Sequence, residues 1–382
     1  MSFVVACPQR SSADYHAEVL AKHGHLRRYF VGTRKPTAGI PPELTSLNPL
    51  WGGVVTASSM VLPGYQGEWL RSALHPWFDR WATARLNPGD NIISSYGYAN
   101  HAFKKVKRNG GFTMVDAGNS HPAHFWEVVS EEHAIWGVKR PPYPPHWNRR
   151  ARAMMEDTDY VICPSRFVEK TFLDNGFASR QLLYAPFPTD LSLFHPEPGI
   201  APPAPDPLLV VCTGSVCLRK GVPYLLEAAR LIRKDRNIKL LLTNQVEPAM
   251  KEILASYSDI PIEWAPTLGH RELAVRLRSA HVFALLSLED GFARTVTEAL
   301  ACGIPAVVTT HTGAMDFIVK GKNGYVVPIR DPHAAAEAII KASMLHRNEV
   351  VMGAELPDLS FAGFEKTFMA ELHQKGLLPL NP

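Results

Sequence analysis

The stretch LLVVCTGSVCLRKGVPYLLEAARLIRK, residues 208–234, contains the pattern that decides the fold. It begins with an apolar run, which is typical of a strand buried in a parallel sheet. A loop with Gly214 and Lys220 follows, and then a helical pattern from Pro223 to Lys234. In α/β sheets, a strand that ends in glycine and leads into a helix often presents a phosphate site. Lys220 would meet such a phosphate as a mobile point charge, and an ordinary surface lysine is the alternative.

Outside this stretch, short apolar runs alternate with helical patterns in both halves of the chain, which indicates parallel sheets covered by helices. A length of 382 residues exceeds that of a usual single α/β core, so we expect two Rossmann-like α/β domains that face each other across a cleft. Strands are expected at Phe3–Cys7, Asn91–Ser94, Thr113–Asp116, Tyr160–Cys163, Leu208–Thr213, Ile238–Thr243, His281–Leu285 and Ala306–Thr309.

A proline-rich segment, EPGIAPPAPDP at residues 197–207, marks the boundary between the two halves. Proline lacks a backbone N–H, so this segment cannot supply regular ladder or helix hydrogen bonds and should form a stiff linker. The predicted domains are therefore residues 1–196 and 208–355. A helix within about 360–382 is a candidate to pack back on the first domain.

Composition and charge exclude several classes of protein. A hydrophobic fraction of 46% and a charged fraction of 20% are typical of a globular chain, and a net charge of +4 does not favour nucleic acid. The densest basic cluster, formed by Lys104, Lys105, Lys107 and Arg108, is expected to be a solvated helix face. The cysteines lack metal-ligand spacing, so we expect small buried hydrophobes in a reducing compartment; they lie at positions 7, 163, 212, 217 and 302.

The sequence also bears on membranes. Its first residues enter an apolar strand directly, so no signal peptide is expected, and no run of 18 apolar residues predicts a membrane span. The expected location is the cytoplasm, with peripheral contact at the inner face of the membrane as an open alternative. That alternative depends on an aromatic stripe at residues 70–81 that includes Trp77 and Trp81. A core helix is the favoured interpretation, and Pro76 is expected to interrupt any long helix.

A second segment, HVFALLSLEDGFARTVTEALACGIP at residues 281–305, combines a strand, an acidic loop and a helix. Asp290 in the loop and Glu298 in the helix could both project into the crevice at the sheet edge. Paired carboxylates accept hydrogen bonds from vicinal hydroxyls, and the free N–H groups of a helix start can hold a phosphate between them. The alternative is an ordinary loop acid and a solvated helical glutamate.

Residues 208–335 resemble the donor-binding half of retaining, family-4-type glycosyltransferases, the large group-1 class with the two-domain GT-B fold. Gly214-Ser215 with Lys220-Gly221 looks like the first motif of that family, and Asp290-Gly291-Phe292 through Glu298-Ala299 looks like the second. The resemblance is good over roughly residues 110–335 and loose over residues 1–90. Further ordered matches are GIPAVV at 303–308, GAMDFI at 313–318 and GYVVP at 324–328.

The resemblance implies a role for each matching residue. Lys220 would contact the donor diphosphate, Asp290 the hydroxyls of the transferred sugar, and Glu298 the ribose. His121 is similar to an acceptor-side histidine near the reacting sugar, with His124 as its rival. The implied catalytic residues are Lys220, Asp290 and His121, and the implied donor-binding residues are Gly214, Ser215, Arg219, Lys220, Asp290, Gly291, Phe292, Ala293, Arg294, Thr295 and Glu298.

Three positions depart from the family pattern. Ser215 stands where the family usually has a phosphate-binding arginine, Asp290 is one methylene shorter than the usual glutamate, and Ala293 replaces a common glycine. Arg219 or Arg294 is a candidate source of the missing positive charge.

The resemblance thus implies a glycosyltransferase that moves a sugar from a nucleotide-diphosphate sugar to an acceptor hydroxyl with retention, without metal or other cofactor. The acceptor domain would be residues 1–196 and the donor domain residues 208–355. The expected partners are a nucleotide sugar and a sugar or lipid-linked glycan acceptor, in polysaccharide or glycoconjugate synthesis. A non-catalytic relative and a nucleotide-sugar epimerase are the alternatives; a dinucleotide oxidoreductase is not favoured, because no Gly-x-Gly-x-x-Gly turn follows a strand. Donor, acceptor and oligomeric state stay open.

Overall fold

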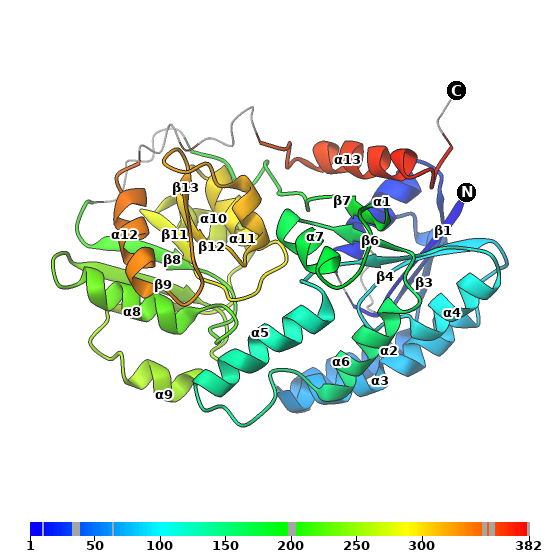
Figure 1. Cartoon of the computed structure of the whole chain (residues 1–382), viewed down its shortest axis with the longest axis horizontal. Helices are drawn as coiled ribbons and strands as arrows, with labels where there is room; N and C mark the ends of the chain where they lie inside the picture. Colours follow the sequence, from blue (N-terminus) through cyan, green and yellow to red (C-terminus); the bar gives the residue numbers. More distant parts are fainter. Residues whose placement is uncertain are drawn as a thin grey trace. The chain divides into compact units, whose positions relative to one another are not determined.

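The computed structural model describes residues 1–9, 11–32, 39–62, 65–197, 204–345, 350 and 356–379. The chain divides into two compact units. Unit 1 contains Met1–Glu127, Arg140–Phe187 and Glu365–Pro382, and unit 2 contains Val128–Lys139 and Pro188–Phe364. Figure 1 shows that each unit is a sheet covered by helices.

Unit 1 is built on a parallel sheet that, within the described residues, has seven strands in the order β3-β2-β1-β4-β5-β6-β7. The strands are β1 Ser2–Cys7, β2 Leu26–Val31, β3 Thr45–Leu47, β4 Asp90–Ser95, β5 Thr113–Asp116, β6 Tyr160–Cys163 and β7 Leu182–Tyr184. The helices are α1 Ala13–Lys22, α2 Pro49–Val61, α3 Tyr65–Thr83, α4 Asn100–Arg108, α5 Pro122–Ile135, α6 Pro145–Met155 and α7 Arg166–Leu173. Short 3₁₀ turns lie at Pro42–Leu44 and Ser179–Gln181.

Unit 2 repeats this architecture with a parallel sheet that has, in the part of the chain described, six strands in the order β10-β9-β8-β11-β12-β13. The strands are β8 Leu208–Cys212, β9 Ile238–Thr243, β10 Ile262–Ala265, β11 Val282–Leu285, β12 Ala306–Thr309 and β13 Gly324–Val327. The helices are α8 Val222–Ile232, α9 Met250–Ala255, α10 His270–Arg278, α11 Arg294–Ala301 and α12 Pro332–Ala342, with a 3₁₀ turn at Gly313–Phe317.

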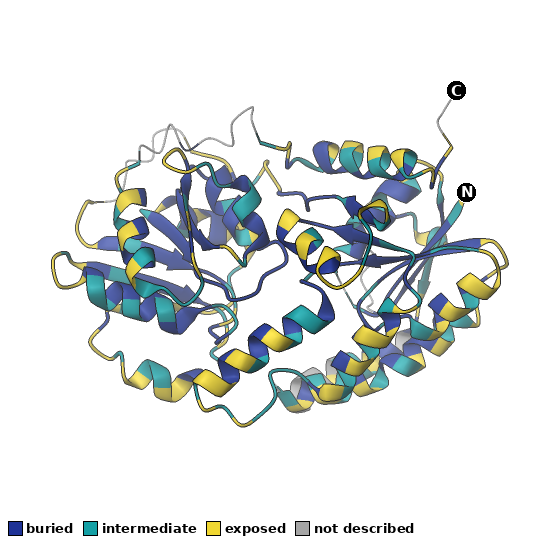
Figure 2. Ribbon diagram, viewed as in Figure 1, coloured by how far each residue is buried: buried dark blue, intermediate teal, exposed yellow. Residues whose placement is uncertain are grey.

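Local sequence explains where several of these helices begin. The Ser165 hydroxyl accepts the backbone N–H of Val168 at 3.1 Å and caps α7. The Asp331 carboxylate accepts the N–H of Ala334 at 2.9 Å and caps α12, whose first residue is a proline. The central strands of both sheets are buried, which Figure 2 shows in dark blue. The two-sheet α/β architecture predicted from the alternating pattern is therefore confirmed.

All five cysteines are buried and free, as predicted. Burial raises the pKa of the Cys7 thiol to about 12 and that of Cys302 to about 11. Both thiols are therefore uncharged at neutral pH and pack as small apolar groups.

The expectation that Pro76 interrupts a long helix is wrong. α3 runs from Tyr65 to Thr83 with Pro76 inside it. Proline removes one backbone hydrogen bond, but Ser72 and Phe78, on either side of it, are fully buried. Burial of side chains on both sides of Pro76 therefore stabilises α3 as one helix. Of the tryptophans in this region, Trp51 is buried while Trp69 and Trp77 are exposed, and no described helix is long and apolar enough to span a membrane.

The chain leaves each unit at places that differ from the expected boundaries. Residues 128–139 and 188–196 group with unit 2, and the central part of the predicted linker, residues 198–203, lies outside the described residues. The last helix, α13 Phe361–Gln374, belongs to unit 1 from Glu365 onward. There Glu365 pairs with Lys22 at 2.6 Å, and the Phe368 ring lies 4.6 Å from that of His16.

Candidate functional site

The candidate site lies at the carboxyl ends of β8 and β11 in unit 2. These strands are neighbours, yet the chain continues from β8 to β9 on one side and from β11 to β12 on the other. The order of strands therefore reverses between them, and ligands of open α/β sheets bind at such a switch point. Residues 213–220 follow β8 and residues 286–295 follow β11. The fold thus brings both predicted segments to one edge of the sheet.

Lys220 and Asp290 meet at this edge in an ion pair between Nζ and Oδ2. Their side chains are only 16% and 10% exposed, so the pair is largely screened from water. Gly214 has φ +108°, and a Cβ there would lie 3.8 Å from Lys220 Cε. At Gly221, φ is +66° and a Cβ would lie 1.8 Å from the Leu286 carbonyl oxygen. Glycine is therefore required where α8 begins, directly after Lys220.

The Asp290 carboxylate also organises the loop before α11. Its Oδ1 accepts the N–H of Ala293 at 3.0 Å, and the N–H of Phe292 also donates to the carboxylate. Burial alone would raise the pKa of Asp290, but the charges of Lys220 and Arg219 and these hydrogen bonds lower it below its ordinary value. The carboxylate is therefore ionised and holds N–H groups that the sequence predicted to face a phosphate.

The predicted phosphate loop differs in exposure along its length. Gly291, Phe292 and Ala293 are buried, Thr295 is half-buried and Arg294 is exposed. The Phe292 ring packs edge-on against Phe317 with centroids 5.6 Å apart, so its side chain belongs to the core of unit 2. Ala293 has φ +59° and ψ +63°, a left-handed conformation that disfavours a side chain. This position therefore has the backbone of a glycine, which explains why the family pattern usually has one there.

Glu298 lies in α11, one helix turn past the phosphate loop. Its Oε2 is buried and has no hydrogen-bond partner among the described residues. Burial raises the pKa of the Glu298 carboxyl, and the charges of Arg294 and His270 offset part of that effect. A buried acceptor without a donor is costly unless a ligand supplies one.

Two further unpaired hydroxyls lie at the same edge, and sequence reasoning missed them. Thr213 Oγ1 and Ser287 Oγ are buried and lack a partner within the described part of the chain. Thr213 directly follows β8, and Ser287 lies two residues past β11. The sequence could have indicated both residues, because each is a small polar residue just after a buried strand, and in this fold such positions face the ligand crevice.

Arg219 forms an ion pair with Glu289 that the sequence did not predict. Its Nη1 donates to the Glu289 carbonyl oxygen at 2.9 Å and lies 3.3 Å from Glu289 Oε2. The Glu289 side chain is fully buried, so the two residues form a largely buried ion pair. Ser215 is exposed and carries no charge.

The two predicted histidines lie in unit 1. His121 precedes α5, and its Nδ1 accepts the N–H of Ala123 at 3.2 Å, which leaves Nε2 as the protonated nitrogen of the neutral ring. Burial, followed by the charges of Arg152 and His124, lowers the pKa of His121 to about 4. His124 is half-buried, and its ring lies 5.9 Å from that of Phe167. At neutral pH His121 is a neutral hydrogen-bond donor.

Comparison with known proteins connects this geometry to a family. Residues 207–344 match the family model described as "Glycosyl transferases group 1". A relative from Mycolicibacterium hassiacum, named MMP alpha-(1->4)-mannosyltransferase, is 29% identical over 217 residues, which are 55% of this chain and 51% of that protein. A putative colanic acid biosynthesis glycosyltransferase, WcaL of Escherichia coli, is 26% identical over 42% of each chain. The chain thus matches about half the length of these curated relatives.

The fold is also shared with solved structures. Sucrose-phosphate synthase from Thermosynechococcus elongatus superposes with a TM-score of 0.70 at 18% identity, and the match covers 99% of both chains. At this identity the likeness shows the fold alone, which is the GT-B fold of two Rossmann-like units.

Proposed function

We propose that the chain, whose residues 207–344 match the family model of group 1 glycosyl transferases, transfers a sugar from a nucleotide-diphosphate sugar to an acceptor hydroxyl. The observation that carries this proposal is at the edge of the unit 2 sheet. The Lys220–Asp290 pair lies at the switch point between β8 and β11, and Glu298 Oε2, in the helix that follows β11, is buried without a partner among the described residues. A cation beside unpaired acceptors suits a ligand with both phosphate and hydroxyl groups.

Donor binding exchanges the partners of this pair. A diphosphate carries more negative charge than one carboxylate, so it takes over Lys220 Nζ. Asp290 is then released to accept hydrogen bonds from the transferred sugar, and the Glu298 carboxylate accepts the ribose hydroxyls. The burial of Glu298 Oε2 without a partner supports this role, because a ribose hydroxyl supplies the missing donor.

Arg294 is the better candidate for the second phosphate cation. The Arg219 guanidinium is bound to the buried Glu289, and turning it toward a phosphate would break this ion pair. Arg294 is exposed at the first position of α11, next to the phosphate loop. Two protein cations would stabilise the leaving diphosphate, so the proposal requires no metal ion or other cofactor.

The transfer proceeds with retention. The bond between the anomeric carbon and the leaving phosphate oxygen breaks, and the acceptor oxygen bonds to that carbon on the same face. The acceptor proton passes to the leaving phosphate, so no strong protein base is needed. His121 acts as a neutral hydrogen-bond donor through Nε2 to a sugar hydroxyl, which its lowered pKa favours.

The proposal extends to the acceptor and to the location of the protein. The acceptor is a sugar or a lipid-linked glycan, and the role of the WcaL relative in colanic acid synthesis supports a place in polysaccharide or glycoconjugate assembly. We place the protein in the cytoplasm, with peripheral contact at the membrane through the exposed Trp69 and Trp77 of α3. An epimerase would instead convert the donor without an acceptor.

The direct test replaces Lys220. In Lys220→Ala, release of nucleoside diphosphate from the donor should fall by about 100–1,000-fold, because a preorganised contact to the leaving group is lost. The assay measures diphosphate release with acceptor and, as slow hydrolysis, without it. The matched control is Lys239→Ala, which removes a lysine that is also ion-paired, to Glu263 at 2.6 Å, but lies in β9 away from the carboxyl edge.

Near-normal turnover in folded Lys220→Ala would overturn the role of Lys220. Wild-type protein that binds nucleotide but never releases diphosphate with any acceptor would favour the non-catalytic alternative. An inverted anomeric centre in the product, read by NMR, would refute retention.

A further inference from the structure

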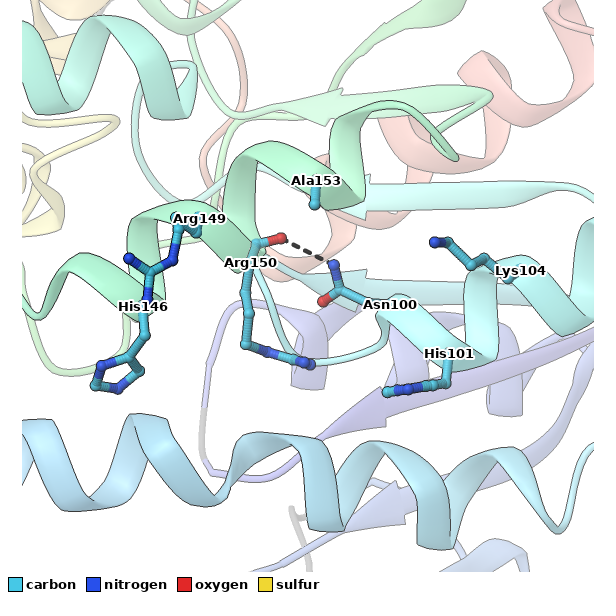
Figure 3. A pocket seen from close by; sticks show the side chains of 7 residues that line it. All are labelled: Asn100, His101, Lys104, His146, Arg149, Arg150 and Ala153. Carbon is cyan, nitrogen blue, oxygen red and sulfur yellow. Dashed lines mark hydrogen bonds between the residues drawn. The ribbon is translucent and has the colours of Figure 1, made fainter.

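A second basic site lies in unit 1 and contains none of the donor residues, which are in unit 2. It is a cavity of about 440 Å³ between α4 and α6, and Figure 3 shows the side chains that line it. Its volume is within the range of small-molecule pockets, about 300–1,000 Å³. The lining residues are Asn100, His101, Lys104, His146, Arg149, Arg150 and Ala153.

No carboxylate is among these lining residues. Arg149 is exposed and forms no hydrogen bond or ion pair with the described residues. Lys104 Nζ lies 3.9 Å from Asp157 Oδ2, and its side chain is 61% exposed, so this contact compensates little of its charge. Two cations therefore face the cavity with little compensation. Lys104 was expected to belong to a solvated helix face; it is exposed as expected, and it also lines this pocket.

The floor of the pocket is held in place by the fully buried Asp79. Its carboxylate accepts the backbone N–H groups of His101 and Ala102, at 2.9 and 3.1 Å, and lies 2.8 Å from His101 Nδ1. Arg150 donates from Nη2 to the same carboxylate at 3.2 Å and from Nε to the Gly97 carbonyl at 3.0 Å. These bonds fix both helices before any ligand arrives.

α4 and α6 are also tied to each other directly. Asn100 Nδ2 donates to the Arg150 carbonyl oxygen at 2.9 Å, the dashed bond in Figure 3. Asn100 Oδ1 is buried and has no partner among the described residues. The spacing of Lys104 on α4 and Arg149 on α6 is therefore set by the fold, as a preorganised binding site requires.

His146, at the edge of the pocket, also senses the positive charge of the two arginines. Burial lowers the pKa of His146, and the positive charges of Arg149 and Arg150 lower it further. The Ser72 hydroxyl lies 2.7 Å from His146 Nε2, and the half-exposed Trp69 meets the ring edge-on at 5.3 Å. An anionic ligand in the pocket would thus meet the cations Lys104 and Arg149 beside the His146 ring, which Ser72 and Trp69 hold in place.

We propose that this pocket binds the phosphate group of a ligand, with Lys104 and Arg149 as the principal contacts. Arginine matches phosphate oxygens bidentately, and lysine adds a mobile point charge. The phosphate belongs either to a free phosphorylated metabolite or to a lipid headgroup, and the chemistry of recognition is the same for both. The inference does not depend on the proposed transferase activity, because its residues lie in unit 1 and the donor residues in unit 2.

The test is a double variant, Lys104→Gln with Arg149→Gln. Both native side chains are exposed, so the variant should fold. The control is Arg108→Gln with Arg152→Gln, which removes one exposed cation from each of the same two helices outside the pocket. The probes are inorganic phosphate and glycerol 3-phosphate, titrated calorimetrically, and phosphatidylcholine vesicles with and without phosphatidic acid, assayed by flotation.

Wild-type and control proteins should bind, and the pocket variant should bind at least about tenfold more weakly, since lost charge-assisted contacts are of that order. Saturation by glycerol 3-phosphate identifies a free metabolite as the source. Binding to phosphatidic acid vesicles alone identifies a lipid headgroup. The Lys220→Ala protein should bind these probes like the wild type, which separates this pocket from the donor site. Equal affinity in the pocket and control variants, or no binding of any probe by the wild type, would overturn the proposal.

Discussion

His121 shows how one residue's surroundings fix its chemistry. Its ring packs edge-on against Phe172 at 5.1 Å, and its Nδ1 is occupied by the N–H of Ala123. A protonated ring would lose the second contact and face the charge of Arg152, which is why the pKa falls to about 4. The residue therefore serves as a neutral donor over the whole physiological range.

This assignment predicts a pH dependence of stability. Above its ordinary pKa of 6.5, His121 is neutral in both the folded and the unfolded chain and contributes no pH dependence. As pH falls from 6.5 to about 4, the unfolded chain binds a proton that the folded chain does not, so the wild type loses stability. The loss relative to His121→Asn should be at most about 3 kcal/mol, and smaller because the ring is partly solvated.

Urea unfolding of wild type and His121→Asn at several pH values measures this difference. A difference that stays constant between pH 6.5 and 4 would mean that His121 titrates normally in the folded protein. His124→Asn is a second variant, which removes the rival histidine and with it one of the charges that lower the pKa of His121.

The sequence pattern predicted a phosphate loop at Lys220 and a crevice at Asp290 and Glu298, and the family resemblance implied that they form one site; the fold does bring their segments to one sheet edge. Spacing could not show that Lys220 and Asp290 pair with each other, or that Glu289 binds Arg219. Both contacts join loops about 70 residues apart, so they depend on the register of β8 against β11.

At the scale of elements, the start of α11 carries a measurable strain. Ala293 is its N-cap and is held at φ +59° by the hydrogen bond from its N–H to Asp290. A left-handed conformation costs an L-residue roughly 1–2 kcal/mol, which glycine avoids. The strain persists because the buried carboxylate needs the donor.

Ala293→Gly should therefore raise the free energy of unfolding by about 0.5–1 kcal/mol, after the larger entropy of the unfolded glycine chain is subtracted. Ala299→Gly, in the middle of the same helix, should lower it by about 1 kcal/mol or more. Chemical denaturation of both variants measures the two effects. If Ala293→Gly destabilises the protein as Ala299→Gly does, the strain is absent.

The predicted strands agree with β1, β4, β5, β6, β8, β9, β11 and β12 within a residue at either end. The remaining strands were missed for physical reasons. β2 contains Arg27 and Arg28, whose side chains bind Asp90 and the Glu43 carbonyl, so its sequence is not continuously apolar. β10 is an edge strand in which only the last of four residues is buried, so it shows no buried apolar run, and the edge strand β7 has only three residues.

At the scale of the whole molecule, the sequence predicted two α/β units and a C-terminal helix that packs back on the first, but not that residues 128–139 belong to unit 2. Residues 128–139 group with unit 2 because Glu132 accepts from Tyr224 at 2.8 Å and pairs with Arg330 at 2.8 Å. The end of the chain groups with unit 1 through Glu365 and Phe368. These contacts join side chains that are roughly 90–340 positions apart in the sequence, and a local sequence pattern does not predict such contacts.

The most direct test of the account is ligand-dependent thermal unfolding of the whole chain, with UDP, GDP, ADP and their common sugar conjugates. A ligand that binds only the folded state at 100-fold excess over its Kd stabilises it by about 2.7 kcal/mol. We predict that one nucleotide raises the unfolding temperature of the wild type and that Glu298→Ala abolishes the rise. No rise with any nucleotide, or an equal rise in Glu298→Ala, would contradict the donor site at the β8–β11 edge.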